Sequence, residues 1–299
     1  MNDYLVSIII PTYNRKDKLE RLINSILQSN YPIERIEIIV VDDASSDGTD
    51  ELINKKFKNI SYIRNEEEKF LAESRNIGAI KAKGRYMFFI DDDNIIEKDT
   101  IVQLINVIRT DNNIGIVGPL MCYYDEKNLI WCAGGKFNRF FIPFHLFLNK
   151  KIEELQLKSL IIDDVDYFPN AYMVRRDIVK TTLHDHKNFP HNWEEQDFCI
   201  RVKKLGYKIV TVTSSKIYHD IDYRDRITRI GIFKTRDQIR SRIIFLKKYG
   251  KLRHKLFFWY IFFPISVVYY LSKILNHNDR YQLLNSYVCG FIEGIKWSE

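Results

Sequence analysis

The chain has 299 residues, of which 45% are hydrophobic and 28% are charged. This balance excludes a disordered or collagen-like chain, and the length suits one large α/β domain or a domain with an appendage. The four cysteines form neither a CxxC pair nor a zinc spacing, so we expect reduced, buried thiols in a cytosolic setting. The N-terminal MNDYLV has no basic stretch leading into an apolar core, so we expect no cleaved secretion signal.

The formal net charge of +7 is concentrated in one segment. Arg224–Lys255 contains twelve lysines or arginines and two acids, and the rest of the chain is slightly acidic. Segments of this kind bind anionic surfaces, either nucleic acid or acidic lipid head groups. A solvated helical face has the same composition and is the alternative.

Strands alternate with helices over the first 120 residues. Short β-branched apolar runs end at a proline, an acid or a turn, and between them leucine and isoleucine recur at helical spacing. The alternation predicts a mostly parallel sheet with helices on both faces. The expected strands are Val6–Asn14, Ile36–Asp43, Asn59–Arg64, Arg85–Ile90 and Ile114–Pro119, and the expected helices are Arg15–Ser29, Asp50–Phe57, Leu71–Lys83 with a left-handed cap at Gly84, and Lys98–Arg109.

Three consecutive aspartates, Asp91, Asp92 and Asp93, follow the apolar run Tyr86–Ile90. Adjacent carboxylates repel one another unless a cation or strong donors lie among them, so the triplet indicates a divalent metal site with oxygen ligands. The alternative is a solvated acidic turn before a helix. Which of the two applies depends on the side chains that reach the same edge of the sheet.

Three polar loops follow strands of the predicted sheet: PTYN, DDASSDGT and DDDN. Ligands of open α/β sheets bind at the carboxyl ends of the strands, so these loops can converge on one crevice. A nucleotide diphosphate in that crevice needs a base pocket, a ribose contact and cations for its phosphates. We expect Tyr13 to stack on the base, Asp43 to accept from a base N–H, and Arg75 to contact phosphate or base.

After Pro119 the sequence becomes aromatic and irregular until Val165–Val179. An aromatic loop beside such a crevice suits binding of an acceptor, although packing against the sheet is the commoner reason for such aromatics. Trp193–Ile209 then predicts a helix with an acidic first turn, stopped at Gly206, and a strand that continues to His219. The glutamates of that first turn are candidates for a general base.

Two adjoining segments form the C-terminal region, residues 223–299. Thr235–Lys255 has its isoleucines on one side and predicts a basic amphipathic helix. Leu256–Leu271 is sixteen residues without a charge, interrupted by Pro264. At about 1.5 Å per residue this run is shorter than the roughly 30 Å hydrocarbon core, so we expect it to lie in a membrane interface or to re-enter it. A buried packing helix or an oligomer contact is the alternative, and the oligomeric state stays open.

Four stretches resemble the signature sequences of the family 2 glycosyltransferases: IIIPTYNR, IIVVDDASSDGT, AESRNIGAIKAKGRYMFFIDDDN and EEQDFCIRVKKLGYKI. They follow one another in the order that the family has them, and the resemblance covers about Val6–His219. The resemblance implies the GT-A fold, a Rossmann-like α/β domain over 1–222 with a nucleotide-binding half, 1–120, and an acceptor-binding half, 121–222. It also implies inverting transfer of a sugar from a nucleotide-diphosphate sugar to a hydroxyl of a saccharide or lipid-linked acceptor.

The resemblance assigns the nucleotide contacts residue by residue. Pro11 and Tyr13 stand where the family lines the base, and Asp43 stands where a carboxylate reads it. Arg75 stands where an arginine follows in the same pocket. The resemblance therefore agrees with the contacts that we expect from the residues themselves.

The resemblance also assigns the metal. Asp91, Asp92 and Asp93 cover the family's DxD motif, and Asp93 matches the residue that binds Mn²⁺ or Mg²⁺ directly. Asp91 and Asp92 would then address ribose and water. His219 stands where many members place a further metal or diphosphate ligand.

The EEQD stretch matches the family's EDxD motif, so Glu195 replaces the aspartate usually taken as the base. This departure leaves Glu194 and Asp197 as competing candidates, with Asp197 expected to be a structural helix carboxylate. Asn170 occupies the acceptor loop where rhamnosyltransferase-like relatives often have glycine. The QxxRW motif of processive members does not follow the base, so we expect one sugar per encounter.

Other functions share parts of this pattern. A phosphorelay receiver domain has an acidic pair after a strand, as at Asp42 and Asp43, but it needs that pair on the first strand and a later lysine before a proline. A nucleotidyltransferase needs a glycine-rich loop where PTYNR stands, and a nucleotide-sugar-binding protein needs no base. The apolar run after the basic segment favours lipid over nucleic acid. We therefore expect a cytoplasmic protein, peripheral or monotopic at the inner face of the plasma membrane.

Overall fold

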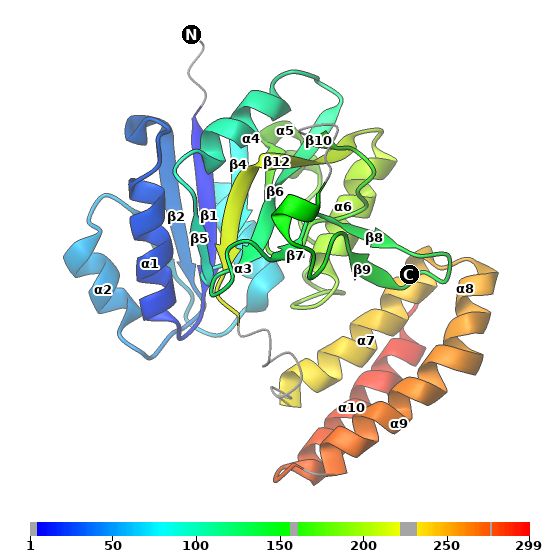
Figure 1. Cartoon of the computed structure of the whole chain (residues 1–299). Coiled ribbons are helices and arrows are strands. Elements are labelled where there is room, and N and C mark those ends of the chain that lie inside the picture. The colour runs from blue at the N-terminus through cyan, green and yellow to red at the C-terminus, as the bar shows by residue number, and fades with distance from the viewer. Residues whose placement is uncertain (1–4, 156–160, 222–231, 276) are drawn as a thin grey trace.

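The computed structural model describes residues 5–155, 161–221, 232–275 and 277–299 (Figure 1). Residues 224–231, at the start of the predicted basic segment, lie outside the described part. Through the first 120 residues, strands and helices alternate as the apolar pattern predicts.

Ten strands in the described part form one sheet, and two more form a short hairpin. The sheet strands are β1 (Val6–Thr12), β2 (Ile36–Asp42), β3 (Ser61–Arg64), β4 (Tyr86–Ile90), β5 (Asn94–Ile96), β6 (Ile114–Tyr123), β7 (Ile130–Cys132), β10 (Ile161–Ile162), β11 (Ala171–Arg175) and β12 (Lys208–His219), and the hairpin strands are β8 (Gly135–Phe137) and β9 (Pro143–His145). The main order is β10-β12-β6-β11-β4-β1-β2-β3, with β5 beside β12 and β7 beside β6.

The sheet is parallel over β1 to β4 and mixed over the remaining strands. β3, β2, β1 and β4 run parallel, whereas β11 is antiparallel to both β4 and β6. All seven residues of β1 and all five of β4 are buried, as expected for central strands covered on both faces. The predicted α/β sheet with helices on both sides is confirmed.

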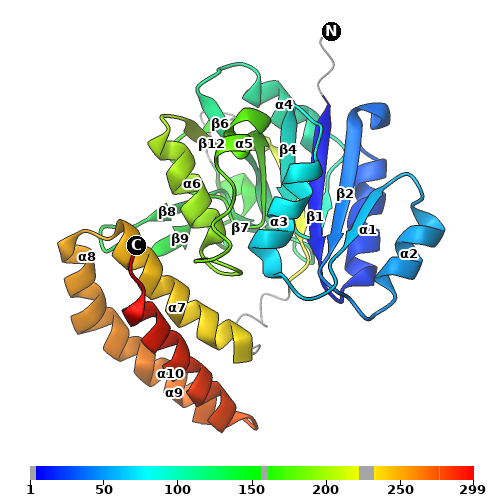
Figure 2. The same cartoon turned by 180° about the vertical axis from the view of Figure 1, so that it is seen from behind.

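Helices cover both faces of the sheet. They are α1 (Lys16–Leu27), α2 (Thr49–Lys56), α3 (Phe70–Lys81), α4 (Thr100–Ile108), α5 (Arg176–Thr181), α6 (Glu194–Lys204), α7 (Ile232–Tyr249), α8 (Leu252–Phe257), α9 (Phe263–Leu275) and α10 (Arg280–Lys296), with a π-helix at Phe258–Phe262 and 3-10 turns at Ile33–Arg35 and Ile152–Glu154. Figures 1 and 2 show α1 and α3 on opposite faces of β1 and β2. The buried apolar face of α1, with Leu19, Leu22, Ile23 and Ile26, explains why this helix packs on the sheet.

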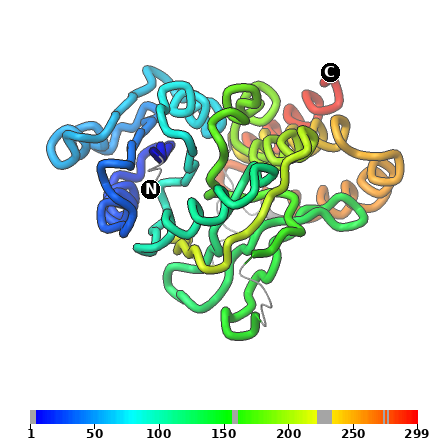
Figure 3. The backbone as a smooth tube through the Cα atoms, turned by 90° about the horizontal axis from the view of Figure 1, so that it is seen from above, coloured from blue at the N-terminus to red at the C-terminus, as the bar shows by residue number. Residues whose placement is uncertain are grey.

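The C-terminal helices form a second hydrophobic core of their own. They lie on the opposite side of the molecule from the N-terminal strands and helices (Figure 3). α10 packs closely along α7 because two glycines face it. A Cβ at Gly290 would lie 2.2 Å from the Arg236 carbonyl oxygen, and one at Gly294 would lie 2.9 Å from Ile243 Cβ. Neither position therefore tolerates a side chain without moving α7.

Three sequence predictions are wrong in detail. Gly84 is not a left-handed cap: its backbone lies against β1, where a Cβ would meet the Ser7 nitrogen at 2.5 Å. The predicted helix Thr235–Lys255 ends at Tyr249, since the chain turns at Gly250 and α8 begins at Leu252. Pro264 does not break the helix: it lies at the second position of α9, directly after the π-helix Phe258–Phe262, and Leu252–Ser272 forms one helical stretch.

Candidate active site

The carboxyl ends of β1, β2 and β4 line one cavity of about 500 Å³. Pro11, Tyr13, Asp43 and Asp91–Asp93, all predicted from the sequence, are among its lining residues. Parallel pairing of β1 with β2 and β4 brings these loops to the same edge. The three polar loops therefore meet at one crevice, with Tyr13 45% exposed at it and accessible to a ligand.

The buried carboxylate of Asp43 organises one wall of this cavity. Its Oδ1 accepts hydrogen bonds from Asn65 Nδ2 and the Lys69 backbone N–H, both at 2.7 Å. Its Oδ2 accepts from the Phe70 backbone N–H at 2.8 Å. Phe70 has a left-handed backbone with φ 66°, which is costly for an aromatic residue. Asp43 therefore stabilises the strained turn that brings Phe70 into the cavity wall.

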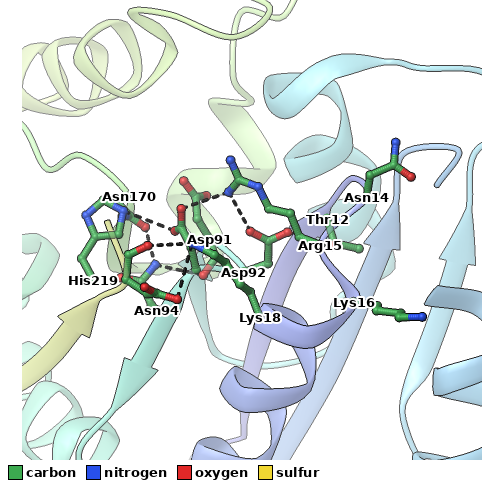
Figure 4. A network of polar contacts seen from close by, with 12 residues as sticks. Thr12, Asn14, Arg15, Lys16, Lys18, Asp91, Asp92, Asn94, Asn170 and His219 are labelled. Atoms are coloured by element: carbon green, nitrogen blue, oxygen red, sulfur yellow. Dashed lines mark hydrogen bonds and ion pairs between the residues drawn. The ribbon is translucent and has the colours of Figure 1, made fainter. Parts of the chain in front are cut away.

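Arg15 faces the aspartate triplet (Figure 4). Its Nη1 lies 3.1 Å from Asp92 Oδ1 and 3.0 Å from Asp93 Oδ2. Thr12 Oγ1 donates to Asp92 Oδ2 at 2.7 Å. Burial raises the pKa of Asp92 to about 7, because Arg15 and Thr12 offset only part of the desolvation. The alternative of a solvated acidic turn is excluded, since Asp92 and Asp93 are buried and paired.

Asp93 and His219 fit a divalent cation. His219 Nε2 lies 3.3 Å from Asp93 Oδ1, and that oxygen is buried without a hydrogen bond in the described part of the chain. Burial acts to raise the pKa of Asp93, but His219 and Arg15 outweigh it and lower the pKa to about 2. A carboxylate oxygen and an imidazole nitrogen 3.3 Å apart offer two ligand atoms for a metal ion. 

These two side chains would provide only part of a coordination shell. Among the residues described by the structure, no group of three or more His, Cys, Asp or Glu side chains is arranged to hold a metal ion. This agrees with the way Mg²⁺ and similar ions bind at phosphate sites, where one or two protein ligands are completed by water and phosphate oxygens.

The structure places Arg75 behind the cavity rather than in its lining. The side chain is fully buried, with Nη2 2.6 Å from Asp91 Oδ1 and 2.9 Å from Glu195 Oε1, and Nη1 3.0 Å from Glu194 Oε1. Burial opposes its charge, but Asp91 and Glu195 hold the pKa of Arg75 well above its usual range. The guanidinium therefore orients three carboxylates and is not presented to a nucleotide as the sequence predicts.

Glu194 and Glu195 begin α6 and differ in their access to solvent. The Glu195 side chain is 12% exposed and that of Glu194 is 2% exposed. Glu195 Oε1 also accepts from the Asn170 backbone N–H at 2.6 Å, and Asn170 holds a left-handed backbone with φ 72°. Burial raises the pKa of both glutamates, most strongly that of Glu194. Both are therefore stronger bases than an exposed glutamate.

Asp197, the third acid of the EEQD stretch, is fully buried and joins α6 to α7. Its Oδ2 accepts from Arg201 Nε at 2.7 Å, and its Oδ1 accepts from Lys248 Nζ at 2.9 Å and Tyr249 OH at 2.6 Å. Both of its oxygens are engaged in these contacts, and Asp197 is not among the lining residues of the cavity. These contacts agree with the expectation that Asp197 is a structural helix carboxylate.

Comparison with known proteins identifies the family. The model of glycosyl transferase family 2 matches residues 7–183. The chain belongs to this family. Its relatives include the Escherichia coli UDP-Glc:alpha-D-GlcNAc-diphosphoundecaprenol beta-1,3-glucosyltransferase WfaP, which is 38% identical over 127 residues, covering 42% of this chain and 49% of that one. This family 2 protein spans between 39% and 49% of the length of the first three curated relatives that it matches.

Solved structures confirm the predicted GT-A fold for this family 2 protein. GalNAc-T7, solved with UDP, GalNAc and Mn²⁺, superposes with a TM-score of 0.69 at 18% identity, over 86% of this chain and 50% of that chain. The mannosyltransferase PcManGT of Pyrobaculum calidifontis, in complex with GDP-Man and Mn²⁺, gives 0.59 at 15% identity, over the whole of this chain and 77% of that one. At these identities the likeness shows the fold alone.

Several residues of the cavity were not predicted from the sequence. Arg15 follows PTYN directly, so its place after the first strand was a signal that could have identified it. Phe70 and His191 also line the cavity, as do Phe233 and Lys234 from the first turn of α7. No local pattern marks Phe233 and Lys234, since they reach the crevice only through the tertiary packing of α7, which follows β12 in the chain.

Proposed function

We propose that this family 2 protein transfers one sugar from a nucleotide-diphosphate sugar to a hydroxyl of a saccharide or lipid-linked acceptor, with inversion, in polysaccharide biosynthesis. The observation that carries the proposal is the shared cavity edge, where Asp43 and Tyr13 meet Asp91–Asp93. A base-binding wall and a cation site within one crevice suit a nucleoside diphosphate. Arg75 connects Glu195 to this crevice, because its Nη2 pairs with both Glu195 and Asp91.

Asp93 and His219 would hold Mn²⁺ or Mg²⁺. When bound, the ion neutralises charge on the leaving diphosphate. Structural relatives solved with Mn²⁺ support this assignment. Asp91 and Asp92 are proposed to address ribose and water, and Arg15, which is 40% exposed in its side chain, adds a positive charge on the same side.

Glu195 is the proposed base. Its Oε1 is held by Asn170 and Arg75, while its Oε2 accepts no hydrogen bond among the described residues. That oxygen takes the proton of the acceptor hydroxyl, whose oxygen then attacks the anomeric carbon as the bond from that carbon to the diphosphate breaks. A single displacement of this kind inverts the configuration. Glu194 is less suited, because its side chain is almost completely buried.

The test is replacement of Asp93 by alanine in the full chain. With a panel of nucleotide sugars and MnCl₂, the parent should release nucleoside diphosphate from at least one donor, and Asp93→Ala should lose at least a hundredfold of that activity, since about 2.7 kcal/mol or more of charge stabilisation is removed. Asp17→Ala is the control, because Asp17 lies in the first turn of α1 and does not line the cavity. Full metal-dependent activity in Asp93→Ala would contradict the proposal.

We also propose that the protein is cytoplasmic and binds the inner face of the plasma membrane through its C-terminal helices. In the described part, Leu252–Ser272 is the one helical stretch long and apolar enough to cross a membrane, and little of it is buried. Its exposed apolar side chains follow one another at helical spacing: Leu252, Leu256, Tyr260, Ile261, Ile265, Val268 and Tyr269. We call this row the apolar stripe of α8–α9.

The packing of the neighbouring helices supports an interfacial position for this stripe. α10 packs on α9 and α7, and α7 is tied to the catalytic domain through Asp197. A membrane-spanning α9 would draw α10 and the basic helix α7 towards the hydrocarbon, where unpaired charges are costly. A stripe lying flat on acidic lipid, with Lys251 and Arg253 beside it, has no such cost. The name of WfaP, which acts on a diphosphoundecaprenol acceptor, supports a lipid-linked acceptor here.

A further inference from the structure

The first turn of α7 reaches the donor cavity from the C-terminal region. Phe233 and Lys234 line the same cavity as Asp43 and the aspartate triplet. The Phe233 ring stacks on Phe70, with ring centroids 4.0 Å apart and an interplanar angle of 4°. One face of the cavity is therefore built jointly by Phe70 of the α/β domain and Phe233 of the C-terminal region, and Phe233 stays 36% exposed there.

Contacts along its whole length fix α7 on the catalytic domain. Near its start, Asp237 Oδ2 accepts from the Asn192 backbone N–H at 3.0 Å and from Asn192 Nδ2 at 2.6 Å. In its middle, Arg240 Nη1 donates to the Asn188 carbonyl at 2.8 Å. At its end, Lys248 Nζ lies 2.9 Å from Asp197. The position of the first turn thus follows from the fold of α6 and the loop before it.

The cavity has an excess of negative charge that a diphosphate would have to overcome. Its acidic lining residues are Asp43, Glu68, Asp91, Asp92 and Asp93, and its lysines and arginines are Arg15 and Lys234. Burial, with Lys234 next in effect, lowers the pKa of His191 to about 4, so this ring is neutral near pH 7. Arg15 is shared between Asp92 and Asp93. Lys234, in the first turn of α7, is the second cation of the lining.

We propose that the first turn of α7 is part of the donor site, with Lys234 contacting the diphosphate and Phe233, together with Phe70, contacting the nucleoside. This inference rests on the proposed function. A lysine is a compact cation that suits phosphate oxygens, and a pair of aromatic rings offers a face for a base or a ribose. The C-terminal region thereby contributes to substrate binding and is not a separate membrane anchor.

Two probes separate the two contacts. Inorganic pyrophosphate carries the diphosphate without a nucleoside, and UDP or GDP, whichever the parent binds more tightly, carries both. Binding of each probe to the full chain is measured by titration calorimetry with MnCl₂. Lys234→Ala should lower the affinity for both probes by about tenfold, because one charge-assisted contact is lost. Lys234→Arg should restore most of the affinity. Phe233→Ala should lower the affinity for the nucleotide by about tenfold and leave the affinity for pyrophosphate within twofold of the parent's.

Matched controls are available on other faces of the protein. Lys180→Ala removes an exposed lysine from α5, and Phe144→Ala removes an aromatic ring of similar exposure, 44%, and both should bind like the parent. If Lys234→Ala and Phe233→Ala also bind like the parent while Asp93→Ala loses metal-dependent binding, the inference is wrong and the proposed function stands. If the parent binds neither probe, both fail. Unchanged thermal unfolding of the two variants excludes a folding defect as the cause of weaker binding.

Discussion

The carboxyl edge of the sheet and the apolar stripe of α8–α9 use the protein surface in opposite ways. At the sheet edge, charged groups are buried and paired with one another, and Arg75 is 0% exposed among three carboxylates. On the stripe, apolar groups are left in contact with solvent, with Ile265 66% and Val268 69% exposed. The charged groups of the edge pair mainly with one another, whereas the stripe needs a partner to cover it.

This difference predicts how much each region contributes to the free energy of folding. At the sheet edge, burying the charged groups costs desolvation free energy, which their ion pairs offset. The loss of one ion pair should therefore lower the stability of the whole domain. The stripe contributes little to folding, so changes there should alter surface binding and leave stability almost unchanged. α7 is shared by the two regions, since its first turn lines the cavity and α10 packs along it.

The largest effect is expected at Arg75. Arg75→Met removes the common partner of Asp91, Glu194 and Glu195 and leaves these carboxylates buried and unpaired. The free energy of unfolding should fall by about 3–5 kcal/mol, as for other buried ion pairs that lose one member. Urea denaturation followed by circular dichroism measures this change.

The surface pair of Lys56 and Glu20 is the control for that measurement. Their side chains are 53% and 28% exposed at an N–O distance of 2.7 Å. Lys56→Met should change the free energy of unfolding by about 1 kcal/mol or less, as is usual for exposed pairs. Equal effects of Arg75→Met and Lys56→Met would show that the buried network carries no special share of stability.

A smaller and different effect is expected on the stripe. The double variant Ile265→Asp, Val268→Asp should reduce co-sedimentation with vesicles containing anionic lipid by at least tenfold, because two apolar contacts are lost and two negative charges are added. Thermal unfolding should stay close to that of the parent. Leu205→Asp, at a 56% exposed position on the catalytic domain, is the matched control.

Two other outcomes would change the assignment of the stripe. If the parent does not bind vesicles but is dimeric in sedimentation velocity, and the double variant is monomeric, a second copy of the chain covers the stripe. If duplex DNA binds and vesicles do not, the basic face of the C-terminal region recognises nucleic acid, and the membrane proposal is wrong.

The smallest expected effect is a pH dependence of the folding stability, caused by the buried His184. His184 is buried, with its ring stacked on Phe198 at 4.5 Å, and burial, with Arg75 and Arg201, lowers its pKa well below the usual value. The folded state thus keeps a neutral ring that the unfolded chain protonates, so stability is full above about pH 6.5 and falls below it, by up to about 1.4 kcal/mol per pH unit.

Thermal unfolding between pH 7.5 and pH 5.5 checks this prediction. The melting temperature of the parent should fall over this interval, and that of His184→Gln should fall less, from a lower starting value. An identical pH dependence in the two proteins would assign the effect to another group, with His191 the next candidate because its pKa is also lowered.

The sequence was sufficient for the sheet edge because its signals are local. Buried parallel strands favour mostly apolar runs, and Val6–Thr12, Ile36–Asp42 and Tyr86–Ile90 have them. The polar residues that follow such runs must lie at one edge, which is why Tyr13, Asp43 and Asp93 were identified together.

The remainder depends on contacts that no short window contains. The motif that contains Arg75 predicts a contact with the nucleotide. In the structure its guanidinium instead pairs with three acids that are distant in the sequence: Asp91, Glu194 and Glu195. α10 was not predicted, since its glycines lower helix propensity and are explained only by the close approach of α7. Strands β7 to β10 are two or three residues long, which is too short for any period to appear.

The contact of Asp197 with Lys248 and Tyr249 also bears on the order in which the protein is completed during synthesis. The sheet edge can form once β12 has left the ribosome, but α6 lacks two of its partners until α7 follows. α7 in turn is covered by α10 at the end of the described chain. The nascent chain would therefore complete the proposed donor site and bury the inner side of the C-terminal helices in the same late step.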